Sequence, residues 1–188
     1  MYKTAYISVL LLLFTINTYS QANQREYYQL KTYLLDTEEQ EKSTDDYLSK
    51  ALLPALKKLN IKNVGVFKPR TIDSLHPRSI KVLIPMKAID DMETMGTKLQ
   101  KDKVYMATAK DFLDAPYNNP PYSRVESVIL KAFVEMPKMK PSPLGGPRKD
   151  RIYELRSYES ATEAKYINKV AMFNKGGEVS LFDSLGFN

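Results

Sequence analysis

The sequence contains no cysteine at all. Lipid attachment at cysteine, disulfide bonds, thiol nucleophiles and thiolate metal sites are therefore excluded together. The stability of this chain has to come from packing.

Histidine is nearly absent as well, since His76 is the only one among the 188 residues. The chain therefore offers at most one imidazole ligand, which argues against a haem or a multi-histidine metal site. His76 lies in the stretch SLHPRS, which is typical of an exposed turn. No P-loop, dinucleotide fingerprint, nucleophile elbow or EF-hand spacing is present. The sequence thus predicts no catalytic residues, no metal site and no cofactor.

A compact block of lysine and arginine interleaved with aromatic residues is also missing, so nucleic acid is not expected as a partner. The net charge of +6 is moderate and favours anionic ligands. Hydrophobic residues at 43% and charged residues at 27% are typical of a globular protein.

The chain begins with a short basic start, MYK, and an apolar run over residues 4–16, TAYISVLLLLFTI. This run is too short to cross a bilayer comfortably and has the length of a signal-peptide core. This run predicts a signal peptide over residues 1–22. The small residues Thr18 and Ser20 allow cleavage before Gln21, and Ser20 and Ala22 allow it before Asn23. The expected protein is exported, periplasmic or secreted, with no stable membrane span after signal removal; an uncleaved anchor is the alternative.

Two stretches repeat each other at a constant offset of 125 residues. YQLKTY, residues 28–33, matches YELRSY, residues 153–158, and Thr37-Glu38 recurs as Thr162-Glu163. A duplicated unit explains this pattern.

The first copy spans residues 25–136. Alternation predicts a strand over residues 26–35, and Thr37 with Gln40 forms a capping box for the helix that follows. The helix carries an apolar stripe of leucines and is kinked at Pro54. Further strands are expected at residues 63–68, 79–85 and 124–136, with helical stretches between the last two. The order strand, helix, strand, strand, helix, strand predicts an α+β, ferredoxin-like βαββαβ repeat.

Residues 137–150 form a linker rich in proline, glycine and basic residues. Residues 151–188 then begin a second repeat that is incomplete, with a strand at 152–158, a capping box of Ser160 and Glu163, and a helix broken at Gly176-Gly177. We expect either a truncated product or a segment that completes a partner's sheet, with unpaired backbone groups along one edge.

The opening strand, the run LLPALKKLNIKNVGVF, the passage KVLIPMKAIDDM and the restart at Arg151 together resemble NIPSNAP-domain proteins over residues 25–188. The resemblance implies two ferredoxin-like halves that form an α+β barrel, as in the dimeric α+β barrel superfamily, and hence a homodimer. That superfamily includes cofactor-free oxygenases, isomerases and haem enzymes.

Alternation along the strands separates two faces. One set should pack against the helices, and the other should line the barrel interior with cations, a carboxylate and aromatic rings. The candidate ligand-binding residues are Lys31, Tyr33, Lys131, Phe133, Glu154, Arg156 and Tyr158. They suit a small anionic or aromatic ligand, although structural ion pairs would give the same pattern.

The sequence therefore predicts an exported NIPSNAP-type protein that binds a ligand or partner without catalysis. A cofactor-free oxygenase or isomerase, in which Tyr33, Lys31 and Arg156 position an anionic substrate, is the alternative. An assembly protein that uses sheet edges is a third class.

Overall fold

The computed structural model describes residues 25–140 and 144–186. The predicted signal peptide, residues 1–22, lies outside the described residues. The chain divides into two compact units. The sheet unit is Glu26–Lys131, and the C-terminal unit comprises Arg25 and the residues from Ala132 onward. In the described ranges, no helix has both the length and the apolar character needed to span a bilayer.

The sheet unit contains four antiparallel strands, β1 (Tyr27–Leu34), β2 (Gly65–Phe67), β3 (Ser79–Met86) and β4 (Arg124–Lys131). Their order in the sheet is β2-β3-β1-β4. One helical segment follows β1 and another follows β3, so the chain has the α+β, ferredoxin-like arrangement predicted from the sequence.

The first helical segment comprises α2 (Glu38–Tyr47), the π-helical η1 (Leu48–Leu52) and α3 (Leu53–Lys58). Its start is the predicted capping box: the Thr37 hydroxyl accepts from the Gln40 amide at 3.2 Å, and the Gln40 side chain accepts from the Asp36 amide at 2.7 Å. Pro54 lacks an amide donor, and the wider π turn directly precedes it. The helix is thus interrupted near Pro54, as predicted, and the interruption takes the form of the π-helical segment η1.

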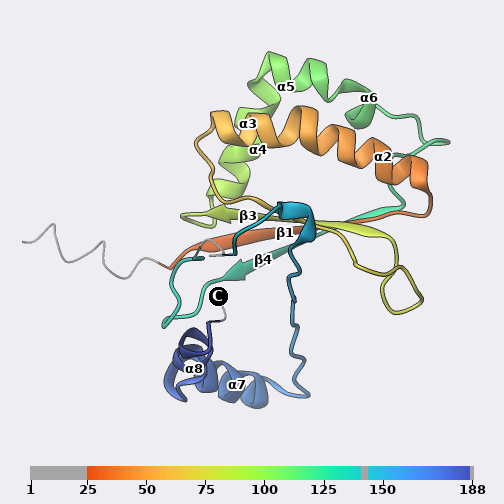
Figure 1. Cartoon of the computed structure of the whole chain (residues 1–188). Helices are drawn as coiled ribbons and strands as arrows, with labels where there is room; N and C mark the ends of the chain where they lie inside the picture. Colours follow the sequence, from red (N-terminus) through yellow and green to blue (C-terminus); the bar gives the residue numbers. More distant parts are fainter. Residues whose placement is uncertain (1–24, 141–143, 187–188) are drawn as a thin grey trace, which may run out of the picture. The chain divides into compact units, whose positions relative to one another are not determined.

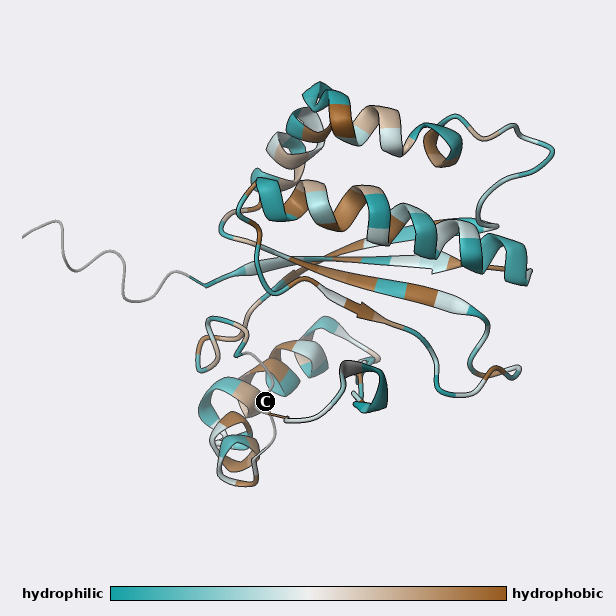
Figure 2. Cartoon of the chain, turned by 45° about the horizontal axis from the view of Figure 1, so that its top comes forward, coloured by the Kyte–Doolittle hydropathy of each residue, from teal (hydrophilic) through white to brown (hydrophobic). Residues whose placement is uncertain are grey.

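The second helical segment comprises α4 (Asp91–Lys101), α5 (Lys103–Thr108) and α6 (Lys110–Leu113). Asp102 separates α4 from α5, and its carboxylate accepts from the amides of Val104 at 3.0 Å and Tyr105 at 3.3 Å. Both helical segments lie on the same face of the sheet (Figure 1). Hydrophobic residues run along the strands and recur at intervals along the covering helices (Figure 2).

The core lies between this helical layer and the sheet. Leu48, Leu52 and Leu56 come from the first helical segment and are at most 3% exposed, while Ile80 and Val82 of β3 are fully buried. Each such side chain contributes about 1.5–3 kcal/mol relative to exposure, which makes this layer the main source of stability.

The pairing register assigns every strand residue to a face. Residues opposite one another in an antiparallel pair share a face, and Tyr33, which pairs with Ile80 and Val125, belongs to the helix-covered core. We call the other surface the helix-free face. Its residues are Tyr28, Leu30, Thr32, Leu34, Gly65, Phe67, Ser79, Lys81, Leu83, Pro85, Arg124, Glu126, Val128 and Leu130.

The last strand is shorter than predicted, because β4 ends at Lys131 and not at Met136. Lys131 pairs with Tyr27, the first residue of β1. Beyond that pair the partner strand has ended, so residues 132–136 have no ladder to join.

The C-terminal unit contains the short η2 (Arg148–Asp150) and two helices, α7 (Glu163–Lys175) and α8 (Glu178–Ser184). The break between α7 and α8 lies at Gly176 and Gly177, as predicted. The strand predicted over residues 152–158 is wrong for the described structure: these residues are exposed and form no ladder there. Isolated strands have no stable backbone pairing, which accounts for the difference.

The cap of α7 also differs from the prediction. The Thr162 hydroxyl, and not that of Ser160, accepts the amide of Lys165 at 3.3 Å. Thr162 lies 125 residues after Thr37, so both copies of the repeat begin their helix at the same position of the pattern.

Candidate functional site

A row of aliphatic side chains crosses the centre of the helix-free face. Leu83 pairs with Leu30, and Leu30 pairs with Val128, so the three lie side by side across β3, β1 and β4. Val128 is 49% exposed, and Leu130, two residues further on, is 38% exposed. We call Leu83, Leu30 and Val128 the apolar row.

Phe67 closes one end of this row. A Cβ added to Gly65 would come within 2.5 Å of the Phe67 ring, so the ring lies directly over the glycine. Gly65 pairs with Leu83, which places the aromatic ring beside the apolar row. A side chain at position 65 would displace that ring.

A polar row runs next to the apolar row. Lys81 pairs with Thr32, and its ammonium donates to the Thr32 hydroxyl at 3.5 Å. Thr32 in turn pairs with Glu126, whose carboxylate lies 3.1 Å from Arg124. Because Glu126 already has a cation beside it, Lys81 is the group of this row best placed to meet an anion. The helix-free face thus combines an apolar strip with a positive charge at its side.

Tyr33 does not lie on this face. Its ring is 2% exposed and packs edge-on to Phe112 at 6.2 Å and Tyr122 at 5.6 Å between centroids. Burial raises the pKa of its phenol, with neighbouring tyrosines adding to the effect. The predicted placement of Tyr33 away from the helices is wrong, because its ring completes the aromatic core under the helical layer.

Lys31 follows Tyr33 to the helix side, which also differs from the prediction. Its ammonium lies 5.5 Å from the centroid of the Tyr33 ring. Burial lowers the pKa of Lys31, since the charged form is poorly solvated there.

Tyr47 and Tyr105 form a hydrogen-bonded pair in the same core, with their hydroxyl oxygens 2.8 Å apart. The Tyr47 ring also stacks on Phe112 at 4.0 Å between centroids. Burial raises the pKa of the Tyr47 phenol, and the phenol of Tyr33 nearby contributes in the same direction. The sequence analysis did not identify this pair. The pattern that could have indicated it is a tyrosine at a core position in each of the two helical segments. A buried, neutral phenol pair is a packing feature.

Lys131 also belongs to the helix side by register. Its ammonium lies 5.3 Å from the centroid of the Tyr27 ring, the residue with which it pairs. Of the predicted site residues, Lys31, Tyr33 and Lys131 therefore share a face of the sheet, but it is the face that the helices occupy.

Phe133 and Tyr158 meet in the C-terminal unit. Phe133 stacks on Phe173 of α7 at 4.6 Å between centroids, and Tyr158 meets the same ring edge-on at 5.7 Å. The ammonium of Lys169 lies 4.5 Å from the Tyr158 ring and 4.9 Å from the Phe173 ring. The structure thus brings these two predicted residues together around an α7 aromatic that the sequence did not place with them.

Glu154 and Arg156 form an exposed ion pair at 2.9 Å. Their hydrogen bond lowers the pKa of Glu154 and raises that of Arg156. The seven predicted residues are therefore divided between the two units, three in the sheet unit and four in the C-terminal unit. Ligand binding by them stays a prediction, but the single barrel lining expected from alternation is not what the sheet unit presents.

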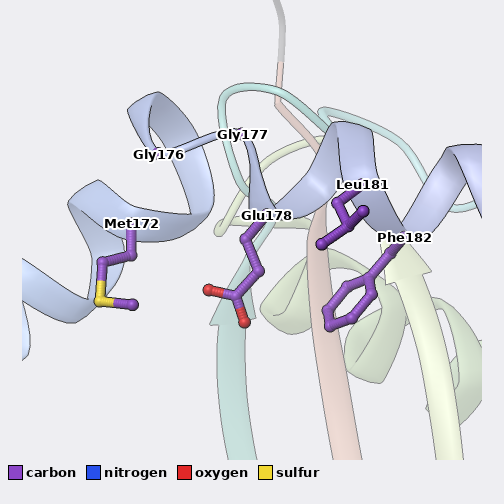
Figure 3. Close-up of a pocket in the computed structure, with 6 residues that line it drawn as sticks. All are labelled: Met172, Gly176, Gly177, Glu178, Leu181 and Phe182. Atoms are coloured by element: carbon purple, nitrogen blue, oxygen red, sulfur yellow. The ribbon is translucent and has the colours of Figure 1, made fainter.

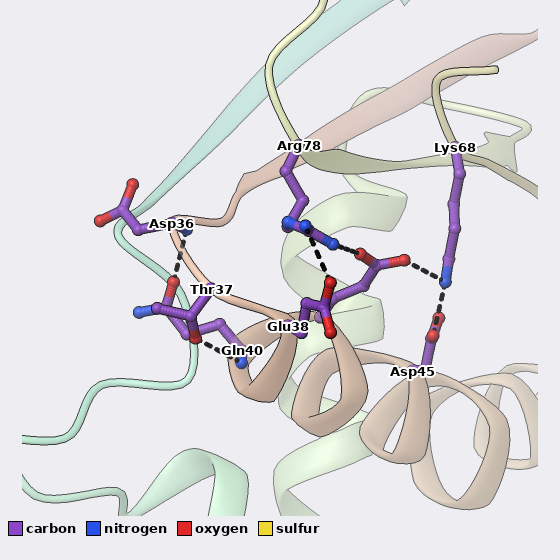
Figure 4. A network of polar contacts seen from close by, with 8 residues as sticks. Asp36, Thr37, Glu38, Gln40, Asp45, Lys68 and Arg78 are labelled. Carbon is purple, nitrogen blue, oxygen red and sulfur yellow. Dashed lines mark hydrogen bonds and ion pairs between the residues drawn. The ribbon is translucent and has the colours of Figure 1, made fainter. Parts of the chain in front are cut away.

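A network of charges joins α2 to the loop between β2 and β3 (Figure 4). Glu41 accepts from Lys68 at 2.8 Å and from Arg78 at 2.5 Å. Lys68 also donates to Asp45 at 2.5 Å, and Arg78 lies 3.5 Å from Glu38. Every charge in the network has an opposite partner, so it fixes the loop and leaves no group for a ligand.

His76 lies in this same loop, where its Nδ1 is 3.0 Å from the Asp73 carboxylate. The Asp73 carboxylate also accepts from the amides of Leu75 and His76. In the described ranges no three histidine, aspartate or glutamate side chains gather as a metal-ligand set. His76 therefore reads as part of a turn.

No family model matches the chain, and no curated protein matches it. Solved structures do resemble it. One is a NIPSNAP family protein of unknown function from Agrobacterium tumefaciens, 14% identical, with a TM-score of 0.46, covering 58% of this chain and 89% of its own. Another is a dimeric protein of unknown function and ferredoxin-like fold from Bacteroides fragilis, 10% identical, with a TM-score of 0.40, covering 57% and 96%.

A third is a putative antibiotic biosynthesis monooxygenase from Nitrosomonas europaea, 10% identical, with a TM-score of 0.38, covering 58% and 91%. At identities of 10–14% and TM-scores below 0.5, these likenesses decide neither a family nor an activity for this chain.

Proposed function

We propose that this chain is a non-catalytic binding protein whose site is the helix-free face of the sheet unit. The observation that carries the proposal is the apolar row of Leu83, Leu30 and Val128, with Phe67 at one end and Lys81 at its side. An aliphatic strip beside one cation suits a small aromatic molecule that carries a negative charge.

The size of the expected effect follows from burial. Covering exposed carbon at Val128 and Leu130 contributes about 25 cal/mol per Å² of apolar surface removed from water. The ammonium of Lys81 adds attraction for an anionic group, and its weak 3.5 Å bond to Thr32 leaves it available. Such a site binds with modest affinity and selects for charge.

The oxygenase alternative is not supported by the geometry. It required Lys31, Tyr33 and Arg156 to face one substrate. Tyr33 instead lies buried under the helices, and Arg156 pairs with Glu154 in the other unit. No observation on the described residues favours catalysis over binding.

Two further parts of the proposal concern where and with what the chain works. We propose export on the basis of the N-terminal apolar run, and an N-terminus at Gln21 or Asn23 in secreted material would support it. We also propose a homodimer; the Bacteroides fragilis neighbour, which is described as dimeric, is in keeping with it. Light scattering across a concentration series measures the oligomeric state.

The binding site is tested with anilinonaphthalene sulfonate, an anionic aromatic probe whose fluorescence rises on binding. Val128→Glu places a negative charge in the apolar row and should weaken the probe at least about tenfold, which corresponds to about 1.4 kcal/mol. Lys81→Met should weaken it by a smaller factor and should do so less at high salt.

The matched control is Val104→Glu, since Val104 is 71% exposed but lies on α5. This variant should bind the probe as the unchanged protein does. The proposed site would be contradicted if Val128→Glu binds the probe as well as the unchanged protein does. It would also be contradicted if Val128→Glu and Val104→Glu weaken the probe equally.

A further inference from the structure

An open surface cavity lies where α7 turns into α8, and its lining residues Met172 and Leu181 are 46% and 55% exposed. Gly177 has a φ of 78°, a left-handed conformation that glycine adopts without strain, and the turn there brings α8 back toward the end of α7. The cavity has a volume of about 370 Å³. It is lined by Met172, Gly176, Gly177, Glu178, Leu181 and Phe182 (Figure 3).

The lining is apolar apart from one carboxylate. Met172, Leu181 and Phe182 supply a thioether, an aliphatic group and a ring, and the side chains in Figure 3 project to the same side of the two helices. Glu178 supplies the only charged group among the lining residues. The cavity is open to solvent, so a ligand would meet carbon and sulfur on its inner side, with a hydrogen-bond acceptor beside them.

The carboxylate of Glu178 keeps part of its capacity to accept hydrogen bonds. Its neighbour Lys169 reaches one carboxylate oxygen, Oε2, at 3.5 Å. This is longer than the roughly 2.7–2.9 Å of a strong charge-assisted bond. The Lys169 ammonium also lies over the rings of Tyr158 and Phe173, at 4.5 Å and 4.9 Å. Glu178 is therefore held in place, and one carboxylate oxygen can still accept from a ligand.

We propose that this cavity binds a small molecule with an apolar body and one hydrogen-bond donor, an amine or an alcohol. The donor would bond to Glu178, and the apolar body would lie against Met172, Leu181 and Phe182. A molecule that ends in a carboxylate is rejected, because it would place a second negative charge against Glu178. The volume lies near the lower end of ligand cavities, which run from about 300 to 1,000 Å³.

This site differs from the one proposed on the sheet unit in both position and charge preference. The helix-free face favours anionic aromatic molecules, whereas the cavity between α7 and α8 excludes them. Failure of either proposal leaves the other standing, because one is measured with an anionic probe and the other with an amine and an alcohol, each with its own reporter.

The test uses the full chain with methyl-labelled methionine, since Met172 lines the cavity and gives a local NMR signal, assigned with Met172→Leu. Three ligands of nearly equal size are added: phenethylamine, phenethyl alcohol and phenylpropionate. The amine and the alcohol should shift the Met172 signal in a saturable way, and phenylpropionate should not. Phenylpropionate shifting the signal as strongly as the amine would overturn the proposal.

Two variants locate the binding. Glu178→Gln should weaken the amine about tenfold, or about 1.4 kcal/mol, and should change the alcohol much less, since the amide oxygen still accepts a hydrogen bond from the hydroxyl. Leu181→Asp should abolish binding of both. The control Leu185→Asp changes a leucine that is 62% exposed and does not line the cavity, and it should bind both ligands normally.

If Leu181→Asp unfolds the helices, the Met172 signal moves before any ligand is added, and the Glu178→Gln comparison then decides. Equal loss of amine and alcohol in Glu178→Gln, or no loss of either, would overturn the assigned role of Glu178 and with it the proposal.

Discussion

At the scale of single residues, Glu41 is the carboxylate that accepts hydrogen bonds from two cations at once. It joins Lys68 and Arg78, which flank the loop between β2 and β3, to α2. Its side chain is 23% exposed, so the pairs are partly shielded from water. Asp45 and Glu38 add a second contact to each cation. Glu41 therefore ties a long loop to a helix.

The pKa of Glu41 is lowered from its ordinary value of 4.5, chiefly by the hydrogen bond from Lys68 and then by that from Arg78. A lowered pKa in the folded state means that the stabilisation is present above the unfolded value and is lost as the pH falls through the folded value. Glu41→Gln should reduce the free energy of unfolding by about 1 kcal/mol at neutral pH, and the difference should shrink toward zero as the pH falls below 4.5 and through the lowered pKa of Glu41.

Urea unfolding of both proteins across that pH range measures this difference. Glu93→Gln, which changes an exposed carboxylate on α4, serves as the control and should follow the unchanged protein at every pH. A Glu41 variant with the same deficit at acidic and neutral pH would mean that shape, and not charge, is what the network requires.

At the scale of elements, the sequence predicted what depends on local patterns. The capping box at Thr37 and Gln40, the order of strands and helices, and the break at Gly176 and Gly177 all rest on neighbours within a few residues, and the structure contains them. The strand over residues 152–158 depended on long-range pairing, which no local pattern reports.

The faces of β1 could not be assigned for the same reason. Alternation shows that Leu30 and Tyr33 point to opposite sides, but it does not show which side the helices cover. The more aliphatic set was expected to lie under the helices. The helices instead cover Tyr33, because aromatic rings from α2, α6 and the segment before β4 surround it. The face of the candidate site therefore required the structure.

The two matching caps give an element-scale prediction. Thr37→Ala removes the acceptor for the Gln40 amide and should cost the sheet unit about 1 kcal/mol, with faster amide exchange in the first turn of α2. Thr162→Ala should do the same to the first turn of α7. Hydrogen exchange followed by mass spectrometry resolves the two helices.

Serine keeps the hydroxyl at both positions, so Thr37→Ser and Thr162→Ser should exchange nearly as the unchanged protein does. If serine and alanine speed exchange equally at either position, the side-chain hydroxyl is not what starts that helix, and the structural equivalence of the two repeats would fail there.

At the scale of the whole molecule, the two units differ in how much of their surface is buried. The sheet unit has the layered core of leucines, β3 aliphatics and tyrosines described above. In the C-terminal unit α7 contains no buried residue, and α8 contains only Val179. Since burial of apolar surface supplies most of the free energy of folding, the C-terminal unit should open far more often than the sheet unit.

Limited digestion with trypsin tests this difference. Lys149 lies in the short η2, and Arg151 and Arg156 lie in the following stretch, which has neither helix nor strand, so cleavage at these residues should come first. The surviving fragment should keep β1 through β4, because its strands and core are complete without the C-terminal unit.

Arg70 supplies an internal comparison, since it lies in the exposed loop of the sheet unit that Lys68 and Arg78 tie to α2. Chymotrypsin cuts after different residues than trypsin does. It should also cleave first in the C-terminal unit if the exposure of the chain, and not its local sequence, determines where cleavage occurs. Cleavage at Arg70 before the 149–156 stretch, or a C-terminal fragment that outlasts the sheet unit, would show that the stability of the chain is distributed in the opposite way. Because the core between helices and sheet holds nearly all the deeply buried side chains, we expect the sheet unit to remain.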